Sequence, residues 1–263
     1  MNASVGTSPC FDPALNRARH ALYRFLSIGF LDPRAEMWQE LADPVLLDSV
    51  RAAAELIREE SLAEAAELGS GERPLNQLDP AEVLAQVPST ENELNAEFER
   101  TFGLLVSGNC PPYATEYIDG KFTFQRSHHL ADIAGFYRAF GLEVSATWPD
   151  RQDHLTLQLE FMSVLIGLEQ AANVESTEGL ERMEVCRAAQ RQFFGDHLAW
   201  WVPTFAKLLC NANPGGFYAE LGLFLTAFIP AERSLLGISP VHGRFKPSLS
   251  HSPEDCEGCG LQL

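Results

Sequence analysis

Apolar side chains recur every three or four positions along most of the chain, which is the spacing of one face of an α-helix. One such series follows Pro13 and comprises Leu15, Ala18, Leu22, Phe25, Leu26 and Gly29. A second belongs to a helix expected to begin at Asp150 or Asp153 and comprises Leu155, Leu159, Met162 and Ile166. Further helices are predicted near 45–60, 90–102, 127–140, 178–194, 196–210 and 215–229. The pattern indicates a single all-α globular domain of about nine to eleven helices.

Capping signals mark where these helices begin and end. Asp-Pro occurs at 12–13, 32–33, 43–44 and 79–80. An Asp side chain accepts free N–H groups of a first turn, and Pro in the next position costs no helical bond, so each pair predicts a helix start. Thr90 with Glu93 forms a capping-box pattern. Gly141 is a stop signal, and Pro203 is expected to kink or split the helix around it.

Two stretches rich in Pro, Gly and polar residues interrupt the helical period. The first, 67–80, predicts a connecting loop, and the second, 239–263, predicts a flexible tail. The helical domain is therefore expected to span 12–238, after an extension at 1–11. Only 121–125, "KFTFQ", alternates like a strand, and it is too short to found a sheet.

The chain is strongly acidic, with a net charge of −17 and an isoelectric point of about 4.7. Such a surface repels nucleic acid and anionic lipid and favours a basic partner, although solubility alone also explains it. The N-terminus lacks a basic region followed by an apolar one, so it predicts no secretory signal. The longest apolar runs are too short to cross a bilayer. We therefore expect a cytoplasmic protein with no nucleic-acid ligand and no membrane insertion.

Common catalytic motifs are missing from the sequence: it contains no GxxxxGK[ST], GxGxxG, GxSxG or HExxH. Neighbouring His128 and His129 would point about 100° apart on a helix, so we expect one outward and one packed side chain rather than a shared metal. Asp153 and His154 have two interpretations. They form a helix cap and a first-turn residue, or they form a recognition point, because a charged histidine would oppose the positive helix end.

Near the C-terminus, Cys256 and Cys259 form a CxxC pair. This is half of a zinc site, and only His251 or Cys110 would complete it if the tail folded back. A redox-active dithiol is another interpretation, and an incidental pair is a third. A metal-binding or redox protein that uses this pair, with His251 or His128, is thus the alternative function. The remaining cysteines are expected to be free thiols: Cys10, Cys110, Cys186 and Cys210.

The segment 110–125, "CPPYATEYIDGKFTFQ", breaks the helical pattern with two prolines, a glycine and four aromatic residues. Along 96–167, a helix ending in Phe-Gly precedes Pro-Pro-Tyr-x-x-x-Tyr and Tyr-x-x-Phe-Gly-Leu, followed by Trp-Pro and Asp-His-Leu-x-x-x-Leu-Glu-Phe-Met. This ordered set resembles the TorD/DmsD/NarJ family of cytoplasmic chaperones for molybdoenzymes. The helical layout agrees over roughly 14–235. The family commonly has Pro directly before Asp-His, where this chain has Gln152.

The resemblance implies an all-α fold with no enzymatic activity of its own. Family members bind the twin-arginine signal peptide of a molybdopterin enzyme, and often its apo catalytic subunit, and delay export until the cofactor is inserted. We assign no cofactor to the chain itself. Carried over by motif, the peptide-binding residues are Pro111, Pro112, Tyr113, Tyr117, Asp153 and His154, with Trp148 and Glu160 as further candidates.

Physical requirements of such a peptide agree with this assignment. A cationic front needs carboxylates, which could be supplied by Asp153, Glu116, Asp119 and Glu160. An apolar follow-on segment needs a groove, which Tyr113, Tyr117 and Trp148 could line. Phe122 and Phe124 are further groove candidates, although buried core is the favoured expectation for both. A third class of function is a homodimeric scaffold that exchanges elements between protomers.

Overall fold

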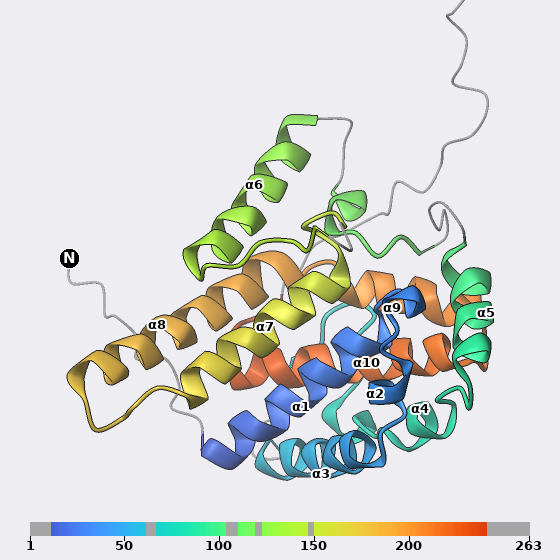
Figure 1. Ribbon diagram of the computed structural model, residues 1–263, viewed down its shortest axis with the longest axis horizontal. Helices are drawn as coiled ribbons and strands as arrows, with labels where there is room; N and C mark the ends of the chain where they lie inside the picture. Colours follow the sequence, from blue (N-terminus) through green and yellow to red (C-terminus); the bar gives the residue numbers. More distant parts are fainter. Residues whose placement is uncertain (1–11, 62–66, 104–109, 119–122, 147–149, 241–263) are drawn as a thin grey trace, which may run out of the picture.

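The computed structural model describes residues 12–61, 67–103, 110–118, 123–146 and 150–240, and the regular structure of these residues is helical (Figure 1). Its α-helices are α1 (Pro13–Gly29), α2 (Trp38–Leu41), α3 (Pro44–Ser61), α4 (Ala81–Ala85), α5 (Glu91–Phe102), α6 (Thr123–Ala139), α7 (Leu155–Gln170), α8 (Thr177–Phe193), α9 (Val202–Ala212) and α10 (Phe217–Leu235). Short 3-10 turns lie at Pro33–Ala35, Leu75–Gln77 and Ala114–Tyr117. The prediction of an all-α fold is confirmed.

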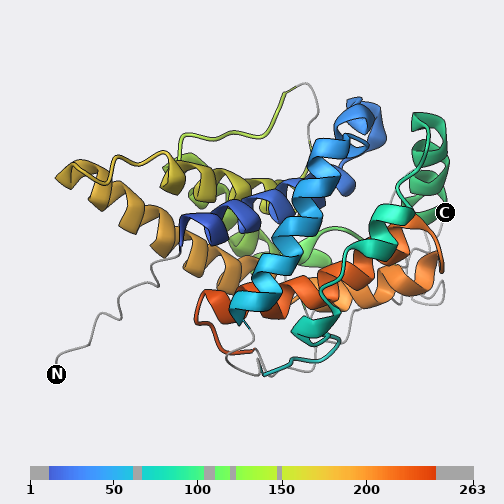
Figure 2. The ribbon, with the colours of Figure 1, turned by 90° about the horizontal axis from the view of Figure 1, so that it is seen from below.

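Helix α1 lies at the centre, packed against α3 on one side and α7 on the other (Figures 1 and 2). Helices α7 and α8 form an antiparallel pair, and α10 pairs with α9 along another side of the molecule. The core between them is aromatic: the ring of Tyr23 on α1 meets that of Phe228 on α10 at 5.0 Å. Amphipathic helices thus bury their apolar faces in one continuous core.

All four Asp-Pro pairs begin helical turns, as predicted. The side chains of Asp12, Asp32, Asp43 and Asp79 each accept the backbone N–H two residues later, at 2.6–3.0 Å. Pro33, however, starts only a short 3-10 turn. At the predicted capping box the Thr90 hydroxyl accepts the Glu93 N–H at 3.2 Å, while the Glu93 carboxylate accepts the N–H of Ser89 at 2.9 Å rather than that of Thr90. These interactions are local, which is why the sequence alone could predict them.

The beginnings of α6 and α9 differ from the prediction. Thr123–Gln125 form the first turn of α6 rather than part of a strand-like segment, because alternation over three residues also fits one helical turn. Lys121 and Phe122 lie outside the described residues. Helix α8 continues into a π-helical turn, Phe194–Leu198, and α9 begins at Val202. The predicted split at Pro203 is confirmed, with the proline in the first turn of α9.

Helix α10 was expected to stop near Ile229 but continues through Pro230 to Leu235. Proline has no N–H, so the carbonyl of Thr226, four residues earlier, loses its helical partner. That carbonyl instead accepts the backbone N–H of Arg73 at 3.0 Å. The loop 67–80, whose prediction is confirmed apart from its 3-10 turn, thus supplies the missing bond. The sequence could not show this, because the partner is distant in the chain.

A buried polar network joins α1, α8 and α10. The guanidinium of Arg19 donates to both oxygens of Glu232 at 3.1 and 2.9 Å, to Asn16 at 2.8 Å and to Gln190 at 2.9 Å. The side chains of Arg19 and Glu232 are 0% exposed. A buried ion pair requires such complete hydrogen bonding, because both charges have lost their water.

Candidate functional site

The segment 110–118, which we call the proline corner, packs against the start of α7. Pro111 and Pro112 cannot extend a helix, so the chain runs extended there. An isolated antiparallel bridge joins Tyr113 to His154. Within it the Leu155 N–H donates to the Pro112 carbonyl at 2.8 Å, and the Ala114 N–H donates to the Asp153 carbonyl at 3.1 Å. The two motifs predicted to cooperate are therefore adjacent.

Asp153 holds the two segments together. Its side chain is 0% exposed and accepts the backbone N–H of Thr115 at 2.9 Å and the hydroxyl of Thr115 at 2.8 Å. It also accepts the forked Nε and Nη2 of Arg151 at 3.0 and 2.9 Å. Its carboxylate is thus engaged on both oxygens, and Asp153 acts on the corner by fixing its conformation.

His154, rather than Asp153, is the N-cap of α7. Its Nδ1 accepts the backbone N–H of Thr156 at 3.2 Å, which requires a neutral ring. Burial lowers the pKa of His154, and this keeps the ring neutral. The expectation that Asp153 caps the helix and His154 lies in its first turn is therefore wrong. A neutral acceptor suits the positive helix end, so the apparent conflict with the helix dipole disappears.

The exposed rim of the site is formed by Tyr113, Glu116 and Arg151. The Cζ atom of Arg151 lies 4.4 Å from the centre of the half-buried Tyr113 ring, and its Nη1 donates to Glu116 at 3.0 Å. Arg126 reaches the other oxygen of Glu116 at 3.7 Å. Burial, followed by the nearby Asp150 carboxylate, raises the pKa of Tyr113 to about 12. The phenol is therefore a neutral aromatic surface at physiological pH.

The other predicted residues divide between interior and surface. Tyr117 is 1% exposed, packs on Trp201 at 5.2 Å and donates its hydroxyl to the Pro111 carbonyl at 2.9 Å. Glu160 is exposed further along α7. Phe124, expected in the core, is 77% exposed at the start of α6, so that expectation is wrong. Candidates that lie outside the described residues are Trp148, Asp119 and Phe122.

The sequence was compared with protein families and with individual known proteins. Residues 50–207 match the family described as nitrate reductase delta subunit. The chain belongs to the nitrate reductase delta subunit family. The resemblance to TorD and NarJ proteins expected from the motifs is thereby confirmed. No solved structure matches the chain.

Curated relatives of this family member carry chaperone names. The chaperone protein TorD of Aliivibrio salmonicida is 28% identical over 55% of this chain and 64% of its own length. The perchlorate reductase assembly chaperone protein of Dechloromonas aromatica is 32% identical over 41% of this chain and 47% of its own. The selenate reductase assembly chaperone protein of Thauera selenatis is 33% identical over 41% of this chain and 53% of its own length. The chain thus spans less than two thirds of these relatives.

Arg151 and Thr115 also belong to this candidate site of the delta subunit family member, although the sequence motifs do not point to them. Arg151 lies two residues before Asp153, a spacing that brings its guanidinium back to that carboxylate only because the loop turns before α7. Thr115 lies between two tyrosines, Tyr113 and Tyr117, and matches no motif of its own. The one available signal was the close alternation of Asp150, Arg151 and Asp153 before a helix start.

The expectations for metal binding and for free thiols can be compared with the structure only within the described residues. Cys256, Cys259 and His251 lie outside the described residues, and the part that the structure describes contains no group of three metal-binding side chains. Within that part Cys186 and Cys210 are free thiols, as expected, and the buried thiol of Cys110 donates to the Thr101 carbonyl at 3.8 Å. His128 is exposed and His129 packs against His197 at 4.9 Å, so the expected division of that pair is confirmed.

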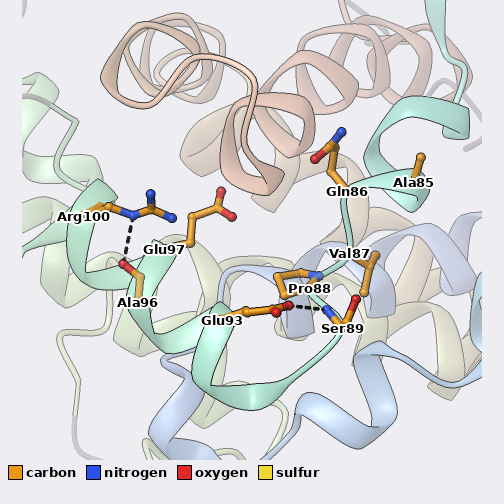
Figure 3. A pocket seen from close by; sticks show the side chains of 9 residues that line it. All are labelled: Ala85, Gln86, Val87, Pro88, Ser89, Glu93, Ala96, Glu97 and Arg100. Carbon is orange, nitrogen blue, oxygen red and sulfur yellow. Dashed lines mark hydrogen bonds between the residues drawn. The ribbon is translucent and has the colours of Figure 1, made fainter.

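Two open hollows lie away from the proline corner. One, of about 380 Å³, lies between the α4–α5 turn and α5, where Glu97 and Arg100 face it (Figure 3). Glu97 has a structural task there, because it accepts the Tyr218 N–H at 3.1 Å and so caps α10, whose own N-cap is a glycine. The other hollow, of about 640 Å³, is lined by residues 36–40 and 42–44. None of the described helices is long and apolar enough to span a bilayer.

Proposed function

We propose that this chain is a cytoplasmic assembly chaperone that binds the twin-arginine signal peptide and the apo catalytic subunit of a molybdopterin-containing oxidoreductase. In this role it assists cofactor insertion, delays export and catalyses no reaction itself. The observation that carries the proposal is the bridge between Tyr113 and His154, which brings the aromatic ring of Tyr113 and the carboxylate of Glu116 to the start of α7. The chaperone names of relatives in the same family support an assembly role over an enzymatic one.

The rim offers what a cationic and apolar leader peptide needs. Glu116 retains 30% exposure and Glu160 is exposed, so both can meet arginine side chains. Tyr113 and Phe124 present aromatic surface, which gives large contact area for little lost side-chain entropy. Trp148 stays part of the proposed groove. The net charge of −17 attracts a basic peptide over a longer range.

Buried residues of the predicted site have supporting tasks in this proposal. Asp153 and Tyr117 hold the proline corner in its conformation, an extended start followed by a 3-10 turn, through their hydrogen bonds to Thr115 and Pro111. His154 fixes the first turn of α7 against Tyr113, with ring centres 5.0 Å apart. Direct contact with the peptide is therefore assigned to the rim, and preorganisation of the rim to the interior.

Calorimetric titration with a signal peptide that contains Arg-Arg, and with the same peptide carrying Lys-Lys, tests the proposal. We expect saturable binding of the Arg-Arg peptide that weakens as salt rises, because ion pairs at an exposed rim are screened. The Lys-Lys peptide should bind more weakly, since ammonium groups cannot form the forked bonds of guanidinium. Equal binding of both peptides, or of neither, would contradict the proposed function.

A further inference from the structure

The guanidinium of Arg151 occupies a seat formed by Tyr113, Thr115, Glu116 and Asp153, which we call the guanidinium seat. Two of its nitrogens donate to the two oxygens of Asp153 at 3.0 and 2.9 Å, and the third donates to Glu116 at 3.0 Å. Nη2 also donates to the Thr115 hydroxyl, and Cζ stands 4.4 Å above the Tyr113 ring. The seat thus matches the fork, the charge and the flat face of an arginine.

Three of the four residues of the seat are held together without help from the occupant, and Glu116 keeps its ion pair with Arg126 at 3.7 Å. The fully buried carboxylate of Asp153 is fixed by the backbone N–H and the hydroxyl of Thr115 at 2.9 and 2.8 Å. Tyr113 is fixed by its bridge to His154. Because these bonds join the proline corner to the start of α7 directly, the seat keeps its shape when the guanidinium leaves.

Its occupant, by contrast, can leave without any change of the fold. The side chain of Arg151 is 42% exposed, whereas that of Asp153 is 0% exposed. The backbone of Arg151 is held separately, since its N–H donates to the Asp150 carboxylate at 2.6 Å and its carbonyl accepts the His154 N–H at 2.9 Å. Rotation about side-chain torsions alone would therefore carry the guanidinium into water.

We propose that Arg151 is an internal competitor, which fills the guanidinium seat in the free protein and gives way to an arginine of the bound peptide. This inference rests on the proposed function, in which that peptide carries paired arginines. An incoming guanidinium restores every hydrogen bond that Arg151 gives up, so exchanging one guanidinium for the other changes the free energy of the seat very little. A lysine cannot restore the fork, so the exchange selects arginine over lysine.

Tethering explains why the seat does not bind arginine indiscriminately. A side chain attached beside its own site acts at an effective concentration on the order of millimolar or higher. Free guanidinium compounds below that concentration do not displace it, whereas a peptide that makes further contacts along the rim does. If the seat is open about one tenth of the time, Arg151 weakens peptide binding about tenfold.

Chemical rescue tests the seat without any signal peptide. The melting temperature of Arg151→Ala is measured with methylguanidinium chloride and, at equal concentration, with methylammonium chloride. The control is Arg182→Ala, which also removes one positive charge but from an exposed pair with Glu178. We expect methylguanidinium to raise the melting temperature of Arg151→Ala by about 2–4 °C over methylammonium, with no such gain in the control or the wild type. Arg151→Gln serves if the alanine variant does not fold.

Peptide affinity tests the competition. Relative to the wild type, Arg151→Ala should bind the Arg-Arg peptide about tenfold more tightly, while Arg182→Ala, with the same net charge, should bind as the wild type does. A purely structural arginine would give the opposite sign, because its loss would loosen the corner and weaken binding.

The two measurements separate the inference from the function on which it rests. Rescue by methylguanidinium together with tighter peptide binding supports the inference. Rescue in a protein that binds no signal peptide supports the guanidinium seat and contradicts the proposed function. Peptide binding by the wild type that is unchanged or weakened in Arg151→Ala, with no selective rescue, overturns the inference and leaves the proposed function standing.

Discussion

Two arginines of this chain are held by carboxylates in contrasting surroundings. Arg19 and Glu232 are both 0% exposed and lie between α1 and α10, where water cannot replace either partner. Arg151 makes a similar fork with Asp153 but keeps 42% of its side chain exposed at the rim of the proline corner. The same bond chemistry therefore stabilises the fold in one place and, in our account, is exchangeable in the other. Access to solvent on the arginine side makes the difference.

Loss of a partner in the sealed cluster should have the largest effect. Glu232→Ala leaves the Arg19 guanidinium buried without its counter-charge, so we expect the free energy of unfolding to fall by about 3–5 kcal/mol. Urea denaturation measures this. Glu178→Ala, which removes the exposed partner of Arg182, should cost less than about 1 kcal/mol. Similar losses in both variants would contradict the contrast between sealed and exposed pairs.

The effect of Asp153→Ala should be intermediate, since the substitution removes the acceptor of two buried Thr115 donors and of the exposed Arg151 guanidinium. The backbone N–H of Thr115 loses a buried acceptor, whereas Arg151 can turn toward water. We expect a loss of about 1–3 kcal/mol in urea denaturation, together with weaker binding of the Arg-Arg peptide. A stability loss as large as that of Glu232→Ala would show that the rim cluster is as sealed as the core cluster.

The cap at His154 adds a pH dependence to the corner. Burial lowers the pKa of His154 below its ordinary value near 6.5, so the unfolded chain binds more protons between that value and the folded pKa. The contribution of this cap to stability is therefore present above pH 6.5 and is lost as pH falls. His154→Asn keeps a capping acceptor but does not titrate. From pH 7 to pH 5 the wild type should lose more stability in urea than this variant.

That comparison isolates one histidine from the others. Burial also lowers the pKa of His129, and it lowers that of His197 to about 4, but both residues titrate in the wild type and in the variant alike. Identical pH profiles for the two proteins would mean that His154 does not cap α7 as a neutral ring.

Glu116→Gln should have the smallest effect on stability and a clear effect on recognition. The Glu116 side chain is 30% exposed, so its pairs with Arg151 and Arg126 contribute less than about 1 kcal/mol to folding. Loss of its charge should nevertheless weaken binding of the Arg-Arg peptide about three- to tenfold, as measured by calorimetry. Glu178→Gln is the control with the same change of charge, and an equal loss of affinity in both would point to long-range charge alone.

Most helices could be predicted from signals between residues close in the sequence. The apolar period and the Asp-Pro pairs depend on neighbouring residues, so helices such as α1 and α3 could be predicted closely. The passage of α10 through Pro230 could not, because it needs the N–H of Arg73 from a loop far away in the chain. The ion pair between Arg19 and Glu232 could not be predicted either, because the two residues are 213 positions apart.

The sequence predicted which motifs meet at the candidate site, but not which of their side chains are buried and which are exposed. The motifs indicated that Tyr113 and His154 belong together, and the bridge confirms their contact. Burial decides which side chains can touch a ligand, and a motif does not reveal it: Asp153 is sealed, whereas Phe124 is exposed. The place of the Arg151 guanidinium could not be predicted, because the four residues that surround it come from two segments.

Photocrosslinking tests most directly whether the rim of the proline corner binds a cationic leader peptide. A benzophenone amino acid replaces Phe124, which is 77% exposed two residues before Arg126, the partner of Glu116, or in a control replaces Leu180, which is 43% exposed on α8. We predict that the Arg-Arg signal peptide crosslinks at position 124, that excess unlabelled peptide competes the product away, and that position 180 gives none. Equal crosslinking at both positions, or none at position 124 while the peptide still binds, would contradict the account.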